Sequence, residues 1–169
     1  GDLEIIATPT DFLGVNYYTR SVIAADPDNE LLGIKGVDVL DAKTTAMGWE
    51  INAPAFERLL RDLQAEYSPA EIFITENGSA WDDVIEVDGT VLDSDRIEYL
   101  DQHLAAMQRA RASGVPASGY FAWSLLDNFE WREGYSKRFG LVHVDFETLN
   151  RTPKASAYWF RDHIAASTA

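Results

Sequence analysis

Three apolar runs alternate along the chain with stretches of helical periodicity. The runs span residues 12–19, 72–75 and 117–125 and are rich in β-branched, aromatic or small side chains. Because each run is apolar almost throughout, rather than at every second position, both faces of each strand are expected to be buried. Strands of this kind, separated by helices, predict an α/β fold: one domain over residues 1–169 with a parallel sheet.

The stretches between the strands carry the signals of helix ends and helix faces. Pro54 suits the first turn of a helix over residues 52–67, and Ser94 suits the cap of a second helix that ends near residue 113, before Gly114. In both stretches, apolar side chains recur three and four positions apart, which predicts one buried face for each helix. The two stripes are Phe56, Leu59, Leu60 and Leu63, and Ile97, Leu100, Leu104 and Met107.

The remaining segments are less regular. Residues 26–48 are polar and contain glycine without sustained periodicity, so we expect a long loop there. Residues 140–146 read as a short β segment, an arm of a hairpin. Thr152 and Pro153 suit the cap and the first position of a final helix that runs to about Ile164.

The strong negative charge argues against several classes of partner. The chain has 28 acidic and 14 basic residues, a formal net charge of −14, so we expect no nucleic acid and no anionic membrane surface as a partner. It has no cysteine and no apolar run that approaches the roughly 20 residues of a membrane span. The chain starts at Gly1 without a signal peptide or a methionine, which favours a cytoplasmic protein and a processed or cut piece.

The segment Ile72–Gly78 places a carboxylate directly after a buried strand. Glu76 and Asn77 follow the apolar run, and catalytic groups of βα folds lie at the carboxyl ends of strands. Gly78 is expected to let the backbone turn sharply there. A glutamate at a strand end is often only a solvated surface group, so Glu76 alone does not establish a function.

Polar and aromatic side chains also follow the other two strands. Asn16, Tyr17 and Tyr18 end the first strand, and Trp123 opens a segment that continues to Trp131. Aromatic faces cover the apolar faces of a sugar ring while carboxylates and amides bind its hydroxyls, so three such groups at one end of a sheet predict a sugar site. The alternative for the tryptophan is a place in the core. Tyr17 and Tyr18 point to opposite faces, so one of them is expected to be core.

Together these motifs resemble glycoside hydrolase family 1, the β-glucosidases and their relatives. Ile74–Gly78 is similar to the nucleophile motif of that family, residues 12–18 to its sixth barrel strand, and residues 120–131 to its eighth strand and following loop. Residues 134–141 and 151–154 match its typical ending. The resemblance implies an α/β fold that is the C-terminal portion, about strands six to eight with their helices, of a TIM (β/α)8 barrel.

The resemblance also implies a reaction and its central residues. Glu76 is similar to the nucleophile that forms a covalent glycosyl-enzyme, Tyr18 to the tyrosine that hydrogen-bonds this nucleophile, and Asn16 to a supporting polar group. The implied activity is retaining hydrolysis of terminal β-D-glucosyl residues of β-glucosides or cello-oligosaccharides, without a cofactor or metal. Glucose, galactose and fucose all remain open as the sugar.

Five further residues are similar to substrate-binding groups of the family. Trp123 is similar to the platform under the glycone sugar, and Glu130 with Trp131 to the pair that grips sugar hydroxyls. Trp49 is similar to a wall of the aglycone site, and Phe139 to a residue that borders the entrance. The Glu130–Trp131 pair disfavours a 6-phosphoglucosidase, since that subgroup carries a smaller polar residue at the second position.

A second carboxylate is missing from the sequence. Retaining hydrolysis needs an acid/base about 5–5.5 Å from the nucleophile. In the family it lies in an Asn-Glu-Pro motif, which this chain lacks. We therefore expect the chain to be inactive alone and to need, as its partner, the missing N-terminal barrel segment that carries the acid/base. The alternatives are a non-catalytic carbohydrate-binding fragment and a structural or interaction module that keeps the partial barrel as a scaffold.

Overall fold

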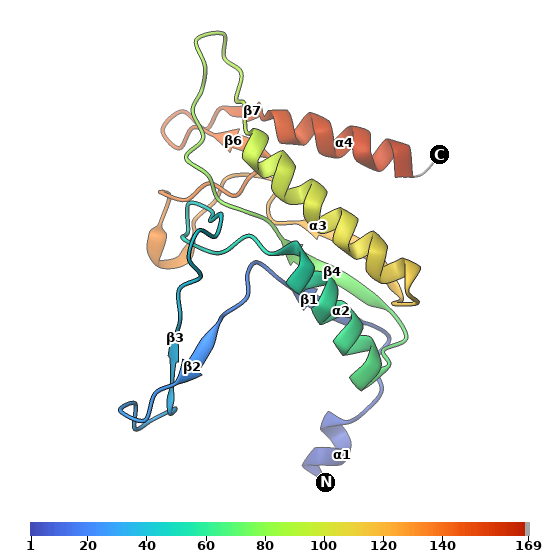
Figure 1. Cartoon of the computed structure of the whole chain (residues 1–169). Coiled ribbons are helices and arrows are strands. Elements are labelled where there is room, and N and C mark those ends of the chain that lie inside the picture. Colours follow the sequence, from blue (N-terminus) through green and yellow to red (C-terminus); the bar gives the residue numbers. More distant parts are fainter. Residues whose placement is uncertain (168–169) are drawn as a thin grey trace.

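The chain folds around a three-stranded parallel sheet, as the computed structural model of residues 1–167 shows (Figure 1). Strand β4 (Ile72–Asn77) lies at the centre, between β1 (Leu13–Asn16) and β5 (Ala117–Ala122). Both neighbours run parallel to β4. The predicted α/β fold with a parallel sheet is thus confirmed.

Three long helices lie side by side along one face of this sheet (Figure 1). They are α2 (Ala53–Tyr67), α3 (Ser94–Ala112) and α4 (Ala155–Ser167), and α3 packs between the other two. The side chain of Asn52 caps α2 by accepting a hydrogen bond from the amide of Ala55 at 2.9 Å. Within residues 1–167, no helix is long and apolar enough to cross a membrane.

The hydrophobic core fills the space between the helices and the sheet. Both predicted helix stripes contribute to it, with Phe56 and Leu60 of α2 fully buried, because one face of each helix is apolar. The core cluster consists of Val15, Tyr17, Ala53, Phe56, Leu60, Ile72, Ile74, Ala106, Met107, Ala110, Val115 and Ala117. This packing fixes β1, β4 and β5 relative to one another, and it therefore also fixes the positions of the side chains at their carboxyl ends.

The opposite face of the sheet is largely uncovered. Phe121 of β5 is 58% exposed, and Phe12, just before β1, is 51% exposed and meets the ring of Phe73 edge to face. Gly119 leaves room for that ring, since a Cβ there would lie 2.4 Å from it. Strands β1 and β5 are the outer strands, and their outer edges pair with no other strand of residues 1–167. Such edges offer unpaired backbone donors and acceptors to a further strand.

Two strand boundaries differ from the expectation. β4 runs beyond residue 75 because Glu76 and Asn77 still pair with the neighbouring strands. β5 ends at Ala122 rather than at residue 125, because the following main chain leaves the sheet and bonds instead with residues 139–142.

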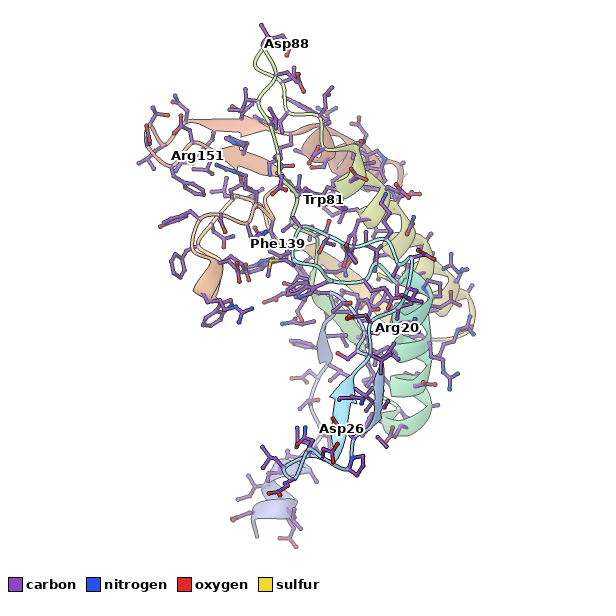
Figure 2. The ribbon with its side chains drawn as sticks, turned by 60° about the vertical axis from the view of Figure 1, so that its left-hand side comes forward. Arg20, Asp26, Trp81, Asp88, Phe139 and Arg151 are labelled. Carbon is purple, nitrogen blue, oxygen red and sulfur yellow. The ribbon has the colours of Figure 1, made fainter. Side chains whose placement is uncertain are left out.

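The segment 26–48 was expected to be a long loop, but part of it forms a strand. It contains β3 (Ile34–Gly36), which pairs antiparallel with β2 (Ile23–Ala25). The hairpin projects from the body of the molecule, with Asp26 near its far end (Figure 2). A short helix that the sequence did not predict, α1 (Asp2–Ile6), lies near the N-terminus and buries none of its residues.

The start of the last helix was predicted wrongly. Thr152 and Pro153 belong to β7 (Arg151–Pro153), which pairs antiparallel with β6 (Val142–Val144) in the hairpin foreseen for this region. The proline stands at the end of a two-stranded sheet, where the missing amide hydrogen costs little. Helix α4 begins only at Ala155.

Candidate active site

A pocket of about 730 Å³ opens beyond the carboxyl ends of β1, β4 and β5. Its walls come from the three strand ends, from the segment before α2 and from the connection between β5 and β6. The fold brings all eight residues singled out from the sequence into its lining: Asn16, Tyr18, Trp49, Glu76, Trp123, Glu130, Trp131 and Phe139.

Five more residues line the same pocket and were missed by the sequence reasoning. They are Ala46, Met47, Arg132, Glu133 and Lys137. Each lies within three positions of a predicted residue, so closeness in sequence was the available signal. Lys137 has a structural role as well, because its Nζ donates to the carbonyl of Ala46 at 2.7 Å and joins two walls of the pocket.

Glu76 and Tyr18 are bonded to each other in the lining of the pocket. The Tyr18 hydroxyl donates to Oε2 of Glu76 at 2.7 Å. Burial raises the pKa of Tyr18 far above its ordinary value, and the hydrogen bond to Glu76 and its charge act in the same direction. Tyr18 therefore stays a neutral donor, and the adjacent Tyr17 turns the other way into the core, where it is 6% exposed.

Asn16 lies beside this pair at the end of β1. Its Oδ1 accepts a hydrogen bond from the hydroxyl of Thr75 at 2.7 Å. This bond crosses from β1 to β4, the strand that carries Glu76. The orientation of the Asn16 amide at the pocket is therefore set from the neighbouring strand.

Aromatic rings surround Tyr18 on two sides. The ring centroids of Trp49 and Phe139 lie 5.5 Å and 6.0 Å from that of Tyr18, both in edge-to-face contact. Phe139 is only 3% exposed. The structure therefore places Phe139 in the inner wall, not at the entrance where it was expected, because the chain around it returns toward β5.

Trp123 is held at the pocket by the strand that carries Glu76. Its amide donates to the carbonyl of Asn77 at 2.9 Å, and its peptide bond to Ser124 is cis. Gly78 is needed for this approach, because a Cβ there would lie 1.8 Å from the carbonyl oxygen of Trp123. Gly78 does not have a positive φ, so close contact rather than the expected sharp turn explains the glycine.

Glu130 and Trp131 lie on the connection that follows β5. The short helix η1 (Trp131–Glu133) begins directly after Glu130, and the Glu130 amide donates to the carbonyl of Gly134 at 2.7 Å. Trp131 is 83% exposed and has φ of 40°, an uncommon backbone conformation for a bulky residue. Burial raises the pKa of Glu130, and the charges of Glu76 and Glu133 add to the effect, while an interaction with Trp123 opposes it.

Six charged side chains beneath this connection form what we call the ionic cluster. Three carboxylates and three cations alternate in it, so its formal charges balance. The cluster joins the loop before α3, the start of α3, the β5–β6 connection and the residue before α4. Its members are Asp83, Asp93, Arg96, Asp127, Arg138 and Lys154.

Asp127 is the member closest in sequence to Glu130. It accepts from Arg138 at 2.6 Å, from Lys154 at 2.9 Å and from the amide of Gly140 at 2.9 Å. Burial alone would raise its pKa, but the charge of Lys154 and the hydrogen bonds from Lys154 and Arg138 outweigh burial and lower the pKa. Asp127 therefore stays ionised and anchors the base of the connection that carries Glu130.

Comparison with known proteins gives these features a family. The model of glycosyl hydrolase family 1 matches residues 1–168. Beta-glucosidase A of Thermotoga maritima is 48% identical over 96% of this chain, and a bifunctional beta-D-glucosidase/beta-D-fucosidase of Bifidobacterium breve is 42% identical over the whole chain. The aligned regions span only 36% and 40% of those two relatives.

Solved structures agree with this assignment. The Thermotoga maritima beta-glucosidase in complex with azafagomine matches 97% of this chain at 46% identity with a TM-score of 0.93, over 37% of its own length. Its complex with isofagomine lactam matches 95% of the chain at 47% identity with a TM-score of 0.91, over 36% of its length. The chain belongs to glycosyl hydrolase family 1, and its fold is the C-terminal portion of that family's barrel.

Proposed function

We propose that this chain supplies the nucleophile and the sugar pocket of a retaining β-glycosidase of the β-glucosidase type. The observation that carries the proposal is the 2.7 Å hydrogen bond from Tyr18 to Glu76 inside a pocket lined by three tryptophans. Relatives that bear the name beta-glucosidase, at 42–48% identity, support the same class of reaction.

Glu76 acts as the nucleophile in the proposed reaction. Tyr18 holds Oε2, so Oε1 attacks the anomeric carbon; the bond to the aglycone oxygen breaks as the bond to Glu76 forms. The leaving oxygen takes a proton from a general acid. A water molecule then attacks the same carbon, gives a proton to that group, now acting as a base, and releases Glu76 and the sugar.

The other lining residues bind the substrate in this proposal. Trp123 forms the platform under the glycone ring, and Glu130 with Trp131 binds its hydroxyls. Asn16 supports the reacting end of the sugar, and Trp49 borders the aglycone, which is the leaving group of a β-glucoside or cello-oligosaccharide.

The general acid lies outside the 169 residues, since the sequence has no Asn-Glu-Pro. We infer that residues 1–169 form one partial barrel domain and that an N-terminal barrel segment, the complementing segment, provides the acid/base. The uncovered face around Phe121 and the outer edges of β1 and β5 are the surface on which it would dock. The chain alone is then inactive toward ordinary glucosides.

Covalent labelling tests this proposal. The chain, alone and with the complementing segment, is incubated with a 2-deoxy-2-fluoro-β-glucoside that has an activated leaving group, which needs no general acid. Mass spectrometry should find one sugar attached to Glu76 in the assembly and none in Glu76→Gln. Glu98→Gln, which removes an exposed carboxylate on α3, should label like the unmodified chain. An assembly that binds glucose but never labels Glu76 would sink the nucleophile assignment.

A second candidate is a carbohydrate-binding fragment without catalysis. The missing general acid favours it for the chain alone. Glucose binding by the isolated chain, measured by calorimetry and lost in Trp123→Ala, together with no labelling of the assembly, would favour this candidate over the glycosidase.

A further inference from the structure

Directly behind Glu76 the chain buries polar groups that take no part in the proposed reaction. Asn77, at the end of β4, is 0% exposed, and Tyr99 of α3 is 1% exposed. Tyr120 of β5 is partly buried, and its hydroxyl donates to Asn77. We call Asn77, Tyr99 and Tyr120 the amide–phenol cluster.

The side chain of Asn77 is fixed by three hydrogen bonds. Its Nδ2 donates to the carbonyl of Tyr17 at 2.6 Å and to the hydroxyl of Tyr99 at 3.0 Å. Its Oδ1 accepts from the hydroxyl of Tyr120 at 2.5 Å. Both amide hydrogens are used, so the orientation of the amide is determined by its partners.

Tyr99 extends this arrangement to the next carbonyl of β1. Its hydroxyl donates to the carbonyl of Tyr18 at 3.1 Å. The Tyr99 ring is itself stacked on His103, with centroids 4.0 Å apart and planes 24° from parallel. Two consecutive carbonyls, those of Tyr17 and Tyr18, are therefore held from β4 and α3 at the point where Tyr18 reaches toward Glu76.

The main chain of Glu76 closes the arrangement from the other side. Its carbonyl accepts from the amide of Tyr17 at 3.0 Å, and Asn77 is the next residue along β4. The cluster thus holds both main-chain segments that bear the Tyr18–Glu76 hydrogen bond. Burial keeps its groups uncharged, because it raises the pKa of Tyr99 and of Tyr120.

We propose that Asn77 and Tyr99 are positioning residues that set the main chain at Tyr17 and Tyr18, so that the Tyr18 hydroxyl meets Oε2 of Glu76. They touch no substrate and act through Tyr18. The geometric part of this inference stands apart from the reaction; its kinetic part rests on the proposed function.

Fluorine NMR tests the geometric part. The chain, assembled with the complementing segment, carries 3-fluorotyrosine at position 18, whose ¹⁹F signal reports the surroundings of that phenol. Tyr99→Phe should shift or broaden the signal. Tyr17→Phe is the matched control: it removes another buried hydroxyl that donates to a backbone carbonyl, that of Asn52 at 2.8 Å, and should leave the signal in place. A signal unmoved by Tyr99→Phe, or moved equally by Tyr17→Phe, would overturn the inference.

A double-mutant cycle on the labelling rate of Glu76 tests the kinetic part. Tyr99→Phe should lower the rate constant about tenfold, the worth of one hydrogen bond, with the half-saturating glucoside concentration unchanged. In the Tyr18→Phe background it should cause no further loss, because its effect passes through Tyr18. If the double variant instead lost the product of the two single losses in rate, Tyr99 would not act through Tyr18. Failure of every variant and of the unmodified assembly to label would count against the proposed function, while the ¹⁹F signal still decides the positioning role.

Discussion

Two buried polar clusters support the two halves of the pocket, and they are built from opposite chemistry. The amide–phenol cluster behind Glu76 contains no formal charge and bonds through one amide and two hydroxyls. The ionic cluster beneath Glu130 consists of carboxylates, guanidinium groups and an ammonium group. The first holds a strand end and the second holds a long connection.

The difference follows from what each cluster supports. The amide–phenol cluster binds the backbone carbonyls of Tyr17 and Tyr18 at a strand end, where uncharged amide and hydroxyl donors are enough to fix the direction of each hydrogen bond. The connection that carries Glu130 is instead tied to several other elements. Charged side chains suit this role, because each carboxylate or guanidinium group can form strong hydrogen bonds with more than one partner. The ionic cluster is therefore sensitive to mutation, because the loss of one member leaves a buried charge without its partner.

The largest effect should come from Lys154→Met, which unbalances the ionic cluster. It keeps most of the apolar part of the side chain but removes one positive partner of Asp83 and Asp127, and we expect a loss of about 3–5 kcal/mol in the free energy of unfolding. Urea unfolding of the assembly at fixed protein concentration measures this. A loss below that of Tyr99→Phe would contradict the contrast between the two clusters.

Acid should next weaken the surroundings of the amide–phenol cluster. Burial lowers the pKa of His103, which stacks on Tyr99, from 6.5 to about 4. The imidazole of His103 therefore takes up a proton more readily in the unfolded chain than in the folded one. Its contribution to the free energy of unfolding is complete above pH 6.5 and decreases as the pH falls. Near pH 4 about 3 kcal/mol of it is lost. Urea midpoints at pH 7, 5.5 and 4 should fall less steeply in His103→Gln than in the unmodified chain. Protonation of the carboxylates lowers the midpoint of both chains alike, so the difference between the two slopes reports His103. Equal slopes would show that His103 is not buried in this way.

Tyr120→Phe should have a smaller effect of about 1 kcal/mol. It removes only the donor to Oδ1 of Asn77, and both donor bonds of that amide remain. Urea unfolding gives the loss, and the ¹⁹F signal at position 18 should move less than in Tyr99→Phe. A larger shift from Tyr120→Phe would place the main contact to Tyr18 on β5 instead of α3.

The smallest effect should come from the surface. Lys43 pairs with Asp95 and Glu98 at 2.9 Å and 2.8 Å, but all three side chains are about half exposed. Lys43→Met should cost less than about 1 kcal/mol, and 1 M salt should remove the difference. The same salt should leave most of the Lys154→Met loss in place. Equal salt dependence would mean that water reaches the ionic cluster.

The sequence predicted those parts of the fold that depend on local pattern. The stripe around Phe56 predicted α2, and the apolar run before Glu76 predicted the central strand, because both follow from the spacing of a few neighbours. Seven of the eight predicted residues of the pocket were found because they stand at a strand end or in a recognisable motif, whereas Trp49, before α2, came from the family resemblance alone. Thr152 and Pro153 misled the prediction, since the same pair suits a helix start and the end of a short strand.

The supporting clusters were out of reach for a physical reason. Asp83 and Lys154 are 71 positions apart, and their contact exists only once β6, β7 and the loop before α3 are in place. Tyr99 and Tyr120 read as ordinary helix and strand residues, and nothing in the sequence aims their hydroxyls at Asn77. Gly78 was noticed, but its reason, the carbonyl of Trp123, lies just beyond the end of another strand, β5.

The hydrogen bond from Lys137 to Ala46 joins residues 91 positions apart, and that from Tyr99 to Tyr18 joins residues 81 apart. Closing such loops costs chain entropy before any contact offsets it, so contacts of this separation form late in folding. On a ribosome the first wall of the pocket emerges long before the second is synthesised. Apolar surface of β1 and β4 therefore stays exposed until most of the chain has been synthesised. Formation of the pocket then requires that this nascent apolar surface is protected from aggregation.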